Sequence, residues 1–195
     1  LINVNRYTGN LPELQEAAMG GGFFVNPLLD DDGIFRRLPM LVRQRNNIYT
    51  ALSLAMFHAL LGHPPLELEI QEGYGGAGEG KLEALHIENF RIPVDEKSGA
   101  LIPYIGKQGS FTYVSATDVL NAVTDPELLR GKIILIGATA VGLLDMRSTP
   151  LQNIYPGVEV HANLLAGMLD QTFKEQPPYV IGLEFVQTLA VGLLM

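Results

Sequence analysis

The sequence contains no cysteine, so disulfide bonds, thiolate catalysis and cysteine-based zinc sites are excluded from the start. Basic residues are also few: 13 Lys and Arg stand against 21 Asp and Glu, which gives a formal net charge of −8. Nucleic-acid-binding proteins carry a basic footprint, so that class is excluded too. Charged residues make up only 17% of the chain and apolar residues 47%, with a mean hydropathy of +0.19. This composition is apolar for a soluble domain and suggests a membrane-facing segment.

The length of 195 residues is enough for one good hydrophobic core. The first residue is Leu1 rather than Met, and the start shows no charged region followed by an apolar signal segment. We therefore expect the chain to be a fragment of a longer protein.

The segment 131–169 has the clearest local pattern in the sequence. Lys132–Ile136 is a β-branched apolar run between two glycines, which predicts a strand buried on both faces. A polar loop follows, and a helical pattern begins at Val158. A strand, a polar loop and a helix in this order place polar groups at the carboxyl end of the strand, where α/β domains bind ligands.

Apolar periodicity and turn residues predict the other elements. A strand over Ile34–Arg43 should form an antiparallel hairpin with a short strand at Phe23. The helix, turn, strand and helix that follow Ser115 imply a parallel strand, so we expect an α/β fold with a mixed sheet and flanking helices. Further helices are predicted over 11–19 and 49–61, and further short strands over 1–4, 86–93 and 100–105.

Two of the predicted helices have an apolar face that should pack on the core. In the helix over 49–61, the face consists of Leu52, Ala55, Met56, Ala59 and Leu60. In the helix that begins at Ser115, it consists of Ala116, Val119, Leu120 and Val123.

One glycine-rich segment is similar to a phosphate-binding loop but lacks required features. Gly75 and Gly80-Lys81 have the spacing of that motif, but Leu82 stands where the hydroxyl residue must be. No apolar strand leads directly into the segment either. We interpret it as a surface loop that does not bind nucleotide.

Two further features do not point to metal sites. The acidic run 30–32 lacks the spacing of a calcium loop and is typical of a turn, with which Arg36 and Arg37 should pair. His58 has no second ligand at metal-binding spacing. The sequence therefore predicts neither a metal ion nor a cofactor.

Four segments carry a family resemblance: DGIFRRLPML at 32–41, GSFTYVSATDVLN at 109–121, LLRGKIILIGATAVGLLDMRSTPL at 128–151 and PGVEVHANLLAGML at 156–169. In this order they resemble the type-two CHASE domain, a sensory extracellular domain associated with cyclases and histidine kinases. The resemblance spans residues 21–169. It implies an extracytoplasmic sensor in a bacterial membrane receptor whose cytoplasmic output is an adenylate or guanylate cyclase, a histidine kinase or a Ser/Thr kinase.

The sequence departs from this family pattern in one respect. The portion that usually precedes the GFFV-like strand at 22–25 is largely missing. We therefore expect an incomplete sheet edge, or an edge that relies on a partner chain.

The carboxyl-terminal segment supports the membrane assignment independently. Residues 179–195 are almost all apolar, interrupted by Glu184 and Gln187. A membrane-spanning helix needs about 20 apolar residues. We therefore predict a partial extracytoplasmic sensory domain over 1–176 and the start of a transmembrane helix over 177–195. The alternative is an amphipathic or core-packing helix of a soluble protein.

Polar residues of the central loop and the following helix are the candidates for ligand binding. Glu159 and Asn163 share a helix face at i and i+4, and an acid near a helix start is favoured by the helix dipole. His161 points elsewhere on the same helix. The alternative is structural, because such residues often satisfy backbone donors of loops. The candidates are Asp145, Arg147, Thr149, Glu159, His161 and Asn163.

Three functions are compatible with these patterns. The first is a sensor that binds a small-molecule or other environmental signal and passes a population shift into the membrane through the tail helix. The second is a dimerisation module without a ligand of its own, which requires a self-complementary apolar surface. The third is a hydrolase using His161 with Asp145 or Glu159, although the chain has no GxSxG motif. For the fragment itself we expect no enzyme activity, a homodimer and contact with the membrane.

Overall fold

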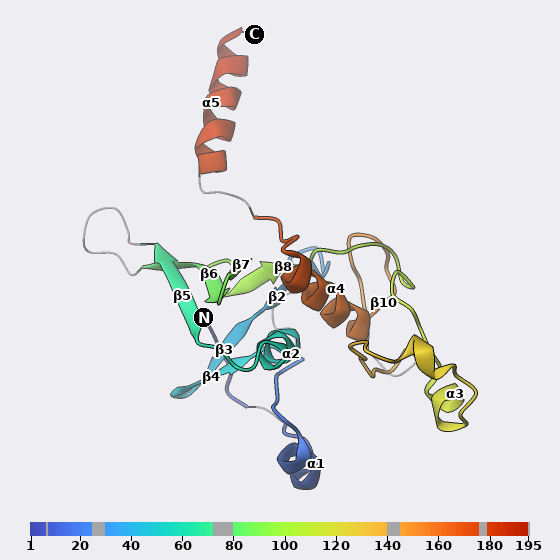
Figure 1. Cartoon of the computed structure of the whole chain (residues 1–195). Coiled ribbons are helices and arrows are strands. Elements are labelled where there is room, and N and C mark those ends of the chain that lie inside the picture. Colours follow the sequence, from blue (N-terminus) through green and yellow to red (C-terminus); the bar gives the residue numbers. More distant parts are fainter. Residues whose placement is uncertain (7, 25–29, 72–79, 140–144, 176–178, 195) are drawn as a thin grey trace.

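The fold is a mixed α/β arrangement in which short strands form separate small sheets and helices flank them (Figure 1). The computed structural model describes the chain except for residues 7, 25–29, 72–79, 140–144, 176–178 and 195. The expected α/β class is confirmed, and both parallel and antiparallel strand pairs occur. The expected single sheet is wrong, because the strands pair in groups of two or three.

The mixed sheet consists of β1 (Ile2–Asn3), β3 (Leu41–Gln44) and β4 (Asn47–Thr50). β1 pairs parallel with β3, and β3 pairs antiparallel with β4. Here the amino-terminal residues supply the parallel strand, which the sequence pattern had placed after Ser115.

The predicted strand over 34–43 is divided in two. Its first part is β2 (Arg37–Pro39), which pairs antiparallel with β8 (Gly99–Leu101). Pro39 cannot donate to a ladder, which favours a break at this point. Leu38, Met40 and Val42 are buried, but Pro39 and Leu41 between them are buried as well, so burial does not alternate along this segment.

The predicted hairpin with Phe23 is wrong. Phe23 forms an isolated parallel bridge with Ala51, and its N–H donates to the Thr50 carbonyl at 3.0 Å. Gly22 permits this close approach, since a Cβ there would lie 2.6 Å from the Leu52 Cα. Residues 25–29, which complete the predicted hairpin, lie outside the described part of the chain.

The acidic turn pairs with Arg36 as predicted. The guanidinium lies 2.7 Å from the Asp30 carboxylate and 2.8 Å from that of Asp32. The hydrogen bond from Arg36 is the main reason that the pKa of Asp32 is lowered to about 2. Arg37 lies 3.7 Å from a different acid, Asp95.

A second three-stranded sheet is antiparallel throughout. It consists of β5 (Leu66–Gln71), β6 (Lys81–Ile87) and β7 (Phe90–Pro93). The predicted strand over 86–93 is therefore two strands joined by a tight turn. The glycine-rich segment between β5 and β6 lies for the most part in 72–79, outside the described residues.

The helices lie close to the predicted positions, except that the helix predicted over 49–61 begins at Leu52, because residues 49 and 50 belong to β4. Gly157 begins the longest one within the domain, and Ser115 precedes a short one, as expected. They are α1 (Pro12–Ala17), α2 (Leu52–Leu60), α3 (Ala116–Leu120), the 3-10 helix η1 (Pro126–Leu128), α4 (Gly157–Asp170) and α5 (Tyr179–Leu194).

The predicted buried face of α2 is wrong. The buried residues are Ser53, Leu54 and Phe57. Because nearly every residue of this helix is apolar, periodicity does not select a face, and packing against α4 decides it. Phe57 makes an edge-to-face contact with Phe90 of β7, with ring centroids 5.0 Å apart.

The core lies between α2, α4 and the strands β2, β6, β7 and β8. Helices α2 and α4 lie side by side over these strands (Figure 1). The largest completely buried side chains include Leu38, Met40, Leu54, Phe57, Leu85, Ile92, Tyr155, Leu164 and Met168.

The prediction of a doubly buried strand at Lys132–Ile136 is wrong. The segment pairs with no strand of the described chain, and Ile133, Ile134 and Ile136 are 47%, 54% and 92% exposed. The predicted apolar face of α3 is exposed as well. A buried strand needs a hydrogen-bonded neighbour on each side, and the described residues supply none here. The βαβ unit expected from this strand is therefore absent from the described chain.

Candidate functional site

The central loop enters α4 through a short ladder. β9 (Met146–Arg147) pairs antiparallel with β10 (Tyr155–Pro156), and α4 begins directly afterwards. The Gly157 N–H donates to the Asp145 carbonyl at 2.9 Å. A Cβ at Gly157 would lie 2.3 Å from the Asp145 Oδ1, so glycine is required at this helix start. The same carboxylate lies 3.5 Å from the Arg147 guanidinium.

Glu159 is buried in the first turn of α4, where its carboxylate accepts hydrogen bonds from the 109–113 loop. The Gly109 and Ser110 N–H groups each lie 3.1 Å from Oε1. The Tyr113 hydroxyl donates to Oε2 at 2.6 Å. Burial, and then the bond to Glu159, raises the pKa of the Tyr113 hydroxyl well above its ordinary value. The acid therefore fixes the position of this loop on α4.

Asn163, one turn further along α4, is completely buried and uses both ends of its amide. Its Oδ1 accepts the Ile105 N–H at 2.9 Å, and its Nδ2 donates to the Tyr155 hydroxyl and the Glu159 carbonyl, each at 2.7 Å. Burial raises the pKa of the Tyr155 hydroxyl to about 12. The predicted shared face of Glu159 and Asn163 is confirmed, and together the two residues attach residues 105–113 to the helix.

Thr149 closes a tight turn of the central loop. Its N–H and its hydroxyl both donate to the Gln152 carbonyl, at 2.9 and 3.0 Å, and the Gln152 N–H donates back to the hydroxyl at 3.2 Å. The side chain is buried. These are the backbone contacts that the structural interpretation of this residue predicts.

His161 lies on a different side of α4 from Glu159 and Asn163. It is buried, and its Nδ1 has no hydrogen-bond partner within the described structure. Burial lowers the pKa of the imidazole, an effect that the nearby negative charge of Asp145 opposes. A buried ring nitrogen without a partner is uncommon, and it distinguishes His161 from the other five candidates.

The six candidates therefore form contacts around the start of α4, but they do not converge on one cavity. A shallow depression of about 360 Å³ lies over Gln108, Gly109, Phe111 and Tyr113, beside the Glu159 carboxylate. No group of three His, Asp or Glu side chains that could hold a metal ion occurs among the described residues. Whether the six bind a ligand stays a prediction.

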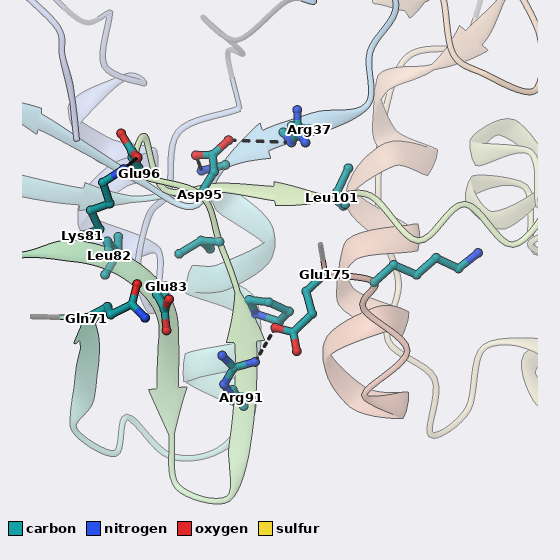
Figure 2. A pocket seen from close by; sticks show the side chains of 14 residues that line it. Arg37, Gln71, Lys81, Leu82, Glu83, Arg91, Asp95, Glu96, Leu101 and Glu175 are labelled. Atoms are coloured by element: carbon teal, nitrogen blue, oxygen red, sulfur yellow. Dashed lines mark hydrogen bonds and ion pairs between the residues drawn. The ribbon is translucent and has the colours of Figure 1, made fainter. Parts of the chain in front are cut away.

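A larger pocket, of about 560 Å³, lies elsewhere, between β6, β7, β8 and the residues that follow α4 (Figure 2). Its lining combines charged and apolar side chains. Leu82, Val94 and Leu101 contribute apolar surface. The charged residues are Arg37, Lys81, Arg91 and Lys174 on one hand and Glu83, Asp95, Glu96 and Glu175 on the other.

Arg91 connects three parts of the structure at this pocket. Its Nε donates to Glu69 on β5 at 2.9 Å. Its Nη1 donates to Glu175 at 2.7 Å, as Figure 2 shows. Its backbone N–H donates to the Oε1 of Gln171, the residue that ends α4, at 3.0 Å. One arginine thus joins the edge strand β7 to the segment that leads from α4 toward α5.

The comparison with known families gives one match. The model of the CHASE2 domain matches residues 3–195, nearly the entire chain. The chain belongs to the CHASE2 domain family. CHASE2 is an extracytoplasmic sensory domain family of signalling receptors and is not catalytic. No curated protein and no solved structure matches the chain.

Sequence reasoning missed the pocket of this CHASE2 domain, although a signal for part of it was present. Residues 66–71 alternate apolar and acidic or amide side chains, which is typical of a strand with one polar face. That pattern predicts β5 and places Glu67 and Glu69 on one side of it. The partners Arg91 and Glu175 come from distant segments, and no local pattern indicates that they meet.

Glu69→Gln is expected to remove an acid-sensitive part of the stability. The hydrogen bonds from Arg91, and then from His86, lower the pKa of Glu69 from 4.5 to about 2. The stabilisation is therefore complete above pH 4.5 and is lost as the pH falls toward 2. Since the pair is about one-third exposed, solvent screening limits the effect to about 1 kcal/mol. Urea unfolding at several pH values in this range measures it.

The matched control is Glu83→Gln, which removes an acid of the same pocket for which the described structure shows no ion pair. The wild type and this control should lose the same stability on acidification, and Glu69→Gln should lose about 1 kcal/mol less. Equal losses in all three proteins would contradict the assignment.

Proposed function

We propose that this chain is the signal-binding part of a bacterial transmembrane receptor, and that it transmits occupancy through α5 to a cytoplasmic cyclase or kinase. Family membership supplies the sensory role. The remaining steps are ligand binding, transmission and anchoring in the membrane, and they rest on the carboxyl-terminal part of the structure.

The observation that carries the proposal is the environment of α5. This helix stands away from the rest of the domain (Figure 1), and its large apolar side chains are exposed. They include Leu183, Phe185, Val186, Leu189, Val191 and Leu193. An exposed helix that is apolar over most of its surface needs another apolar environment, such as a membrane. Within the described residues, no helix combines the length and the apolar character that crossing a bilayer requires.

The connection to α5 supports transmission. Helix α4 packs in the core, and the segment 171–175 that follows it is held to β7 through Arg91. Helix α5 begins at Tyr179. A rearrangement at Arg91 therefore reaches α5 through a short stretch of chain, and a ligand that prefers one arrangement shifts the populations of the two.

Native mass spectrometry of the gently extracted chain tests the proposal. We expect a bound small-molecule mass on the wild type. Its loss in His161→Ala or Asp145→Ala would place the ligand at the central loop, whereas its loss in Arg91→Lys would place it in the charged pocket. A chain that carries no ligand in any preparation, but forms a dimer, would contradict signal binding.

The second candidate is a dimerisation module that aligns the output domains, and the exposed apolar segment 132–136 favours it. Ile136→Lys is then expected to weaken a homodimer about tenfold or more, because burial of such a side chain contributes about 1.5–3 kcal/mol. Sedimentation equilibrium measures the dimer dissociation constant. The control Leu11→Lys changes another exposed apolar residue. Equal effects of the two substitutions, or a wild-type monomer at high concentration, would contradict this candidate.

A further inference from the structure

The charged pocket has the size and the mixed lining of a small-molecule site. Its volume of about 560 Å³ lies within the range of about 300–1,000 Å³ that ligand pockets occupy. Apolar side chains from β6 and β8 lie beside charged ones, so the pocket fits a compact molecule with an apolar body and an ionic end. Whether that ionic end is an anion or a cation depends on which charged side chains of the pocket are already paired with one another.

Most charged side chains of the pocket already neutralise one another in pairs. Lys81 forms an ion pair with Glu96, and Arg37 lies 3.7 Å from Asp95. Asp95 is further occupied by the turn after β7, since its Oδ1 accepts the N–H groups of Lys97 and Gly99 at 2.9 and 2.7 Å. These side chains are therefore already paired, and they hold the wall of the pocket in place.

Arg91 differs, because its two edges have different partners. The edge with Nε and Nη2 faces Glu69 at 2.9 and 3.3 Å, in the forked geometry that orients a guanidinium firmly. The other edge presents Nη1 to Glu175. The first contact lies within the β5–β6–β7 sheet, and the second reaches the segment 171–175.

The carboxylate of Glu175 therefore shows which chemical group suits the outer edge of Arg91. Its side chain is 50% exposed and lies on a segment without regular structure. Ion pairs this exposed contribute little to stability. A ligand carboxylate that also gains apolar contact with Leu82, Val94 or Leu101 should bind Nη1 of Arg91 more favourably than Glu175 does.

We propose that the pocket binds a small organic carboxylate, which replaces Glu175 on Nη1 of Arg91. This inference rests on the proposed sensory function and gives it a site, a ligand class and a switch. When Glu175 leaves Arg91, the segment 171–175 is still held by Gln171 on the backbone of β7, by the Thr172 N–H on the Gly167 carbonyl and by the packing of Phe173 on the core. Residues 174 and 175, which lead toward α5, then move more freely.

Binding is tested by isothermal titration with sodium acetate, succinate, citrate and glutamate at constant ionic strength, with sodium phosphate and sulfate for comparison. At least one carboxylate should bind, and more tightly than either inorganic anion. Arg91→Lys should weaken it about tenfold or more, because the forked geometry is lost while the charge stays. Glu175→Gln should strengthen it by about threefold, since the internal competitor is removed.

The chain offers a matched control pair. Arg130 and Glu127 form an exposed ion pair of 3.1 Å near η1, far from the pocket lining. Arg130→Lys and Glu127→Gln should leave the affinity unchanged. No binding by any carboxylate, equal binding of phosphate, or equal affinity in Arg91→Lys would each overturn the proposal.

The switch is tested separately by spin labels on two introduced cysteines, Asn47→Cys on β4 and Thr188→Cys on α5. Because the chain has no cysteine of its own, these are the only labelled sites. The distance distribution, measured in a non-ionic detergent, should broaden on addition of the carboxylate. It should also broaden without ligand in Glu175→Gln, but not in Glu127→Gln. An unchanged distribution in Glu175→Gln would overturn the switch.

Different results would contradict the carboxylate pocket and the proposed sensory function. A carboxylate that broadens the distribution equally in wild type and Arg91→Lys would overturn this pocket and leave the sensory function intact. A complete set of titrations and mass spectra without any ligand would contradict the proposed signal binding itself.

Discussion

Glu159→Ala is expected to lower the free energy of unfolding by about 2–4 kcal/mol. The buried carboxylate accepts hydrogen bonds from Gly109, Ser110 and the Tyr113 hydroxyl. Removing it costs the net contribution of three hydrogen bonds, about 0.5–1.5 kcal/mol each, because the donors belong to exposed residues that water can reach. The first turn of α4 also loses a favourable negative charge near the helix start. Urea denaturation followed by circular dichroism measures the change.

Two variants separate this effect from a general loss of charge. Glu159→Gln keeps one acceptor oxygen and should cost less than half as much as the alanine variant. Glu127→Ala removes an exposed acid whose pair with Arg130 is of the kind that contributes little. A loss below about 1 kcal/mol in Glu159→Ala would show that the acid does not hold the loop.

The local features of α4 were predictable from the sequence because they depend on neighbours along the chain. Pro156-Gly157 ends an extended loop, and apolar residues at helical spacing follow. The spacing of Glu159 and Asn163 places them on one face in any helix. Their partners in residues 105–113 were not predictable, because loop donors carry no sequence pattern of their own.

The segment 132–136 shows that a local sequence pattern does not predict whether a strand is buried in a sheet. An apolar β-branched run predicts an extended chain, but burial in a sheet requires neighbouring strands that the run does not specify. In the structure the segment has no strand partner among the described residues, and its isoleucines face outward. The expected incomplete sheet edge stays a prediction.

The charged pocket that contains Arg91 could not be predicted from the sequence, for a related reason. Charged residues on β-strands usually mark a solvated face, and the segment after α4 carries no motif. The meeting of Glu69, Arg91 and Glu175 depends on how the end of α4 lies against the edge of β7. Tertiary packing creates this site, so sequence periodicity does not reveal it.

Charged substitutions in α5 should abolish association of the chain with lipid vesicles. Val186→Asp combined with Leu189→Asp places two carboxylates three residues apart, at positions that are now 62% and 51% exposed. A charged side chain in the bilayer centre costs about 2.5–3.5 kcal/mol. Two such charges should reduce vesicle partitioning by at least about 1,000-fold. Co-flotation of the purified chain with neutral phosphatidylcholine vesicles measures the bound fraction.

The matched control places the same charges on α3. Val119→Asp and Leu120→Asp also replace exposed apolar residues of a helix, and this variant should float as the wild type does. Such a difference would locate the membrane contact in α5 and would exclude net charge as its cause, because both variants gain the same charge and the vesicles are neutral. Equal flotation of both variants and the wild type would show that α5 is not the anchor. A wild-type chain that stays in the soluble fraction would favour the alternative in which α5 packs against protein.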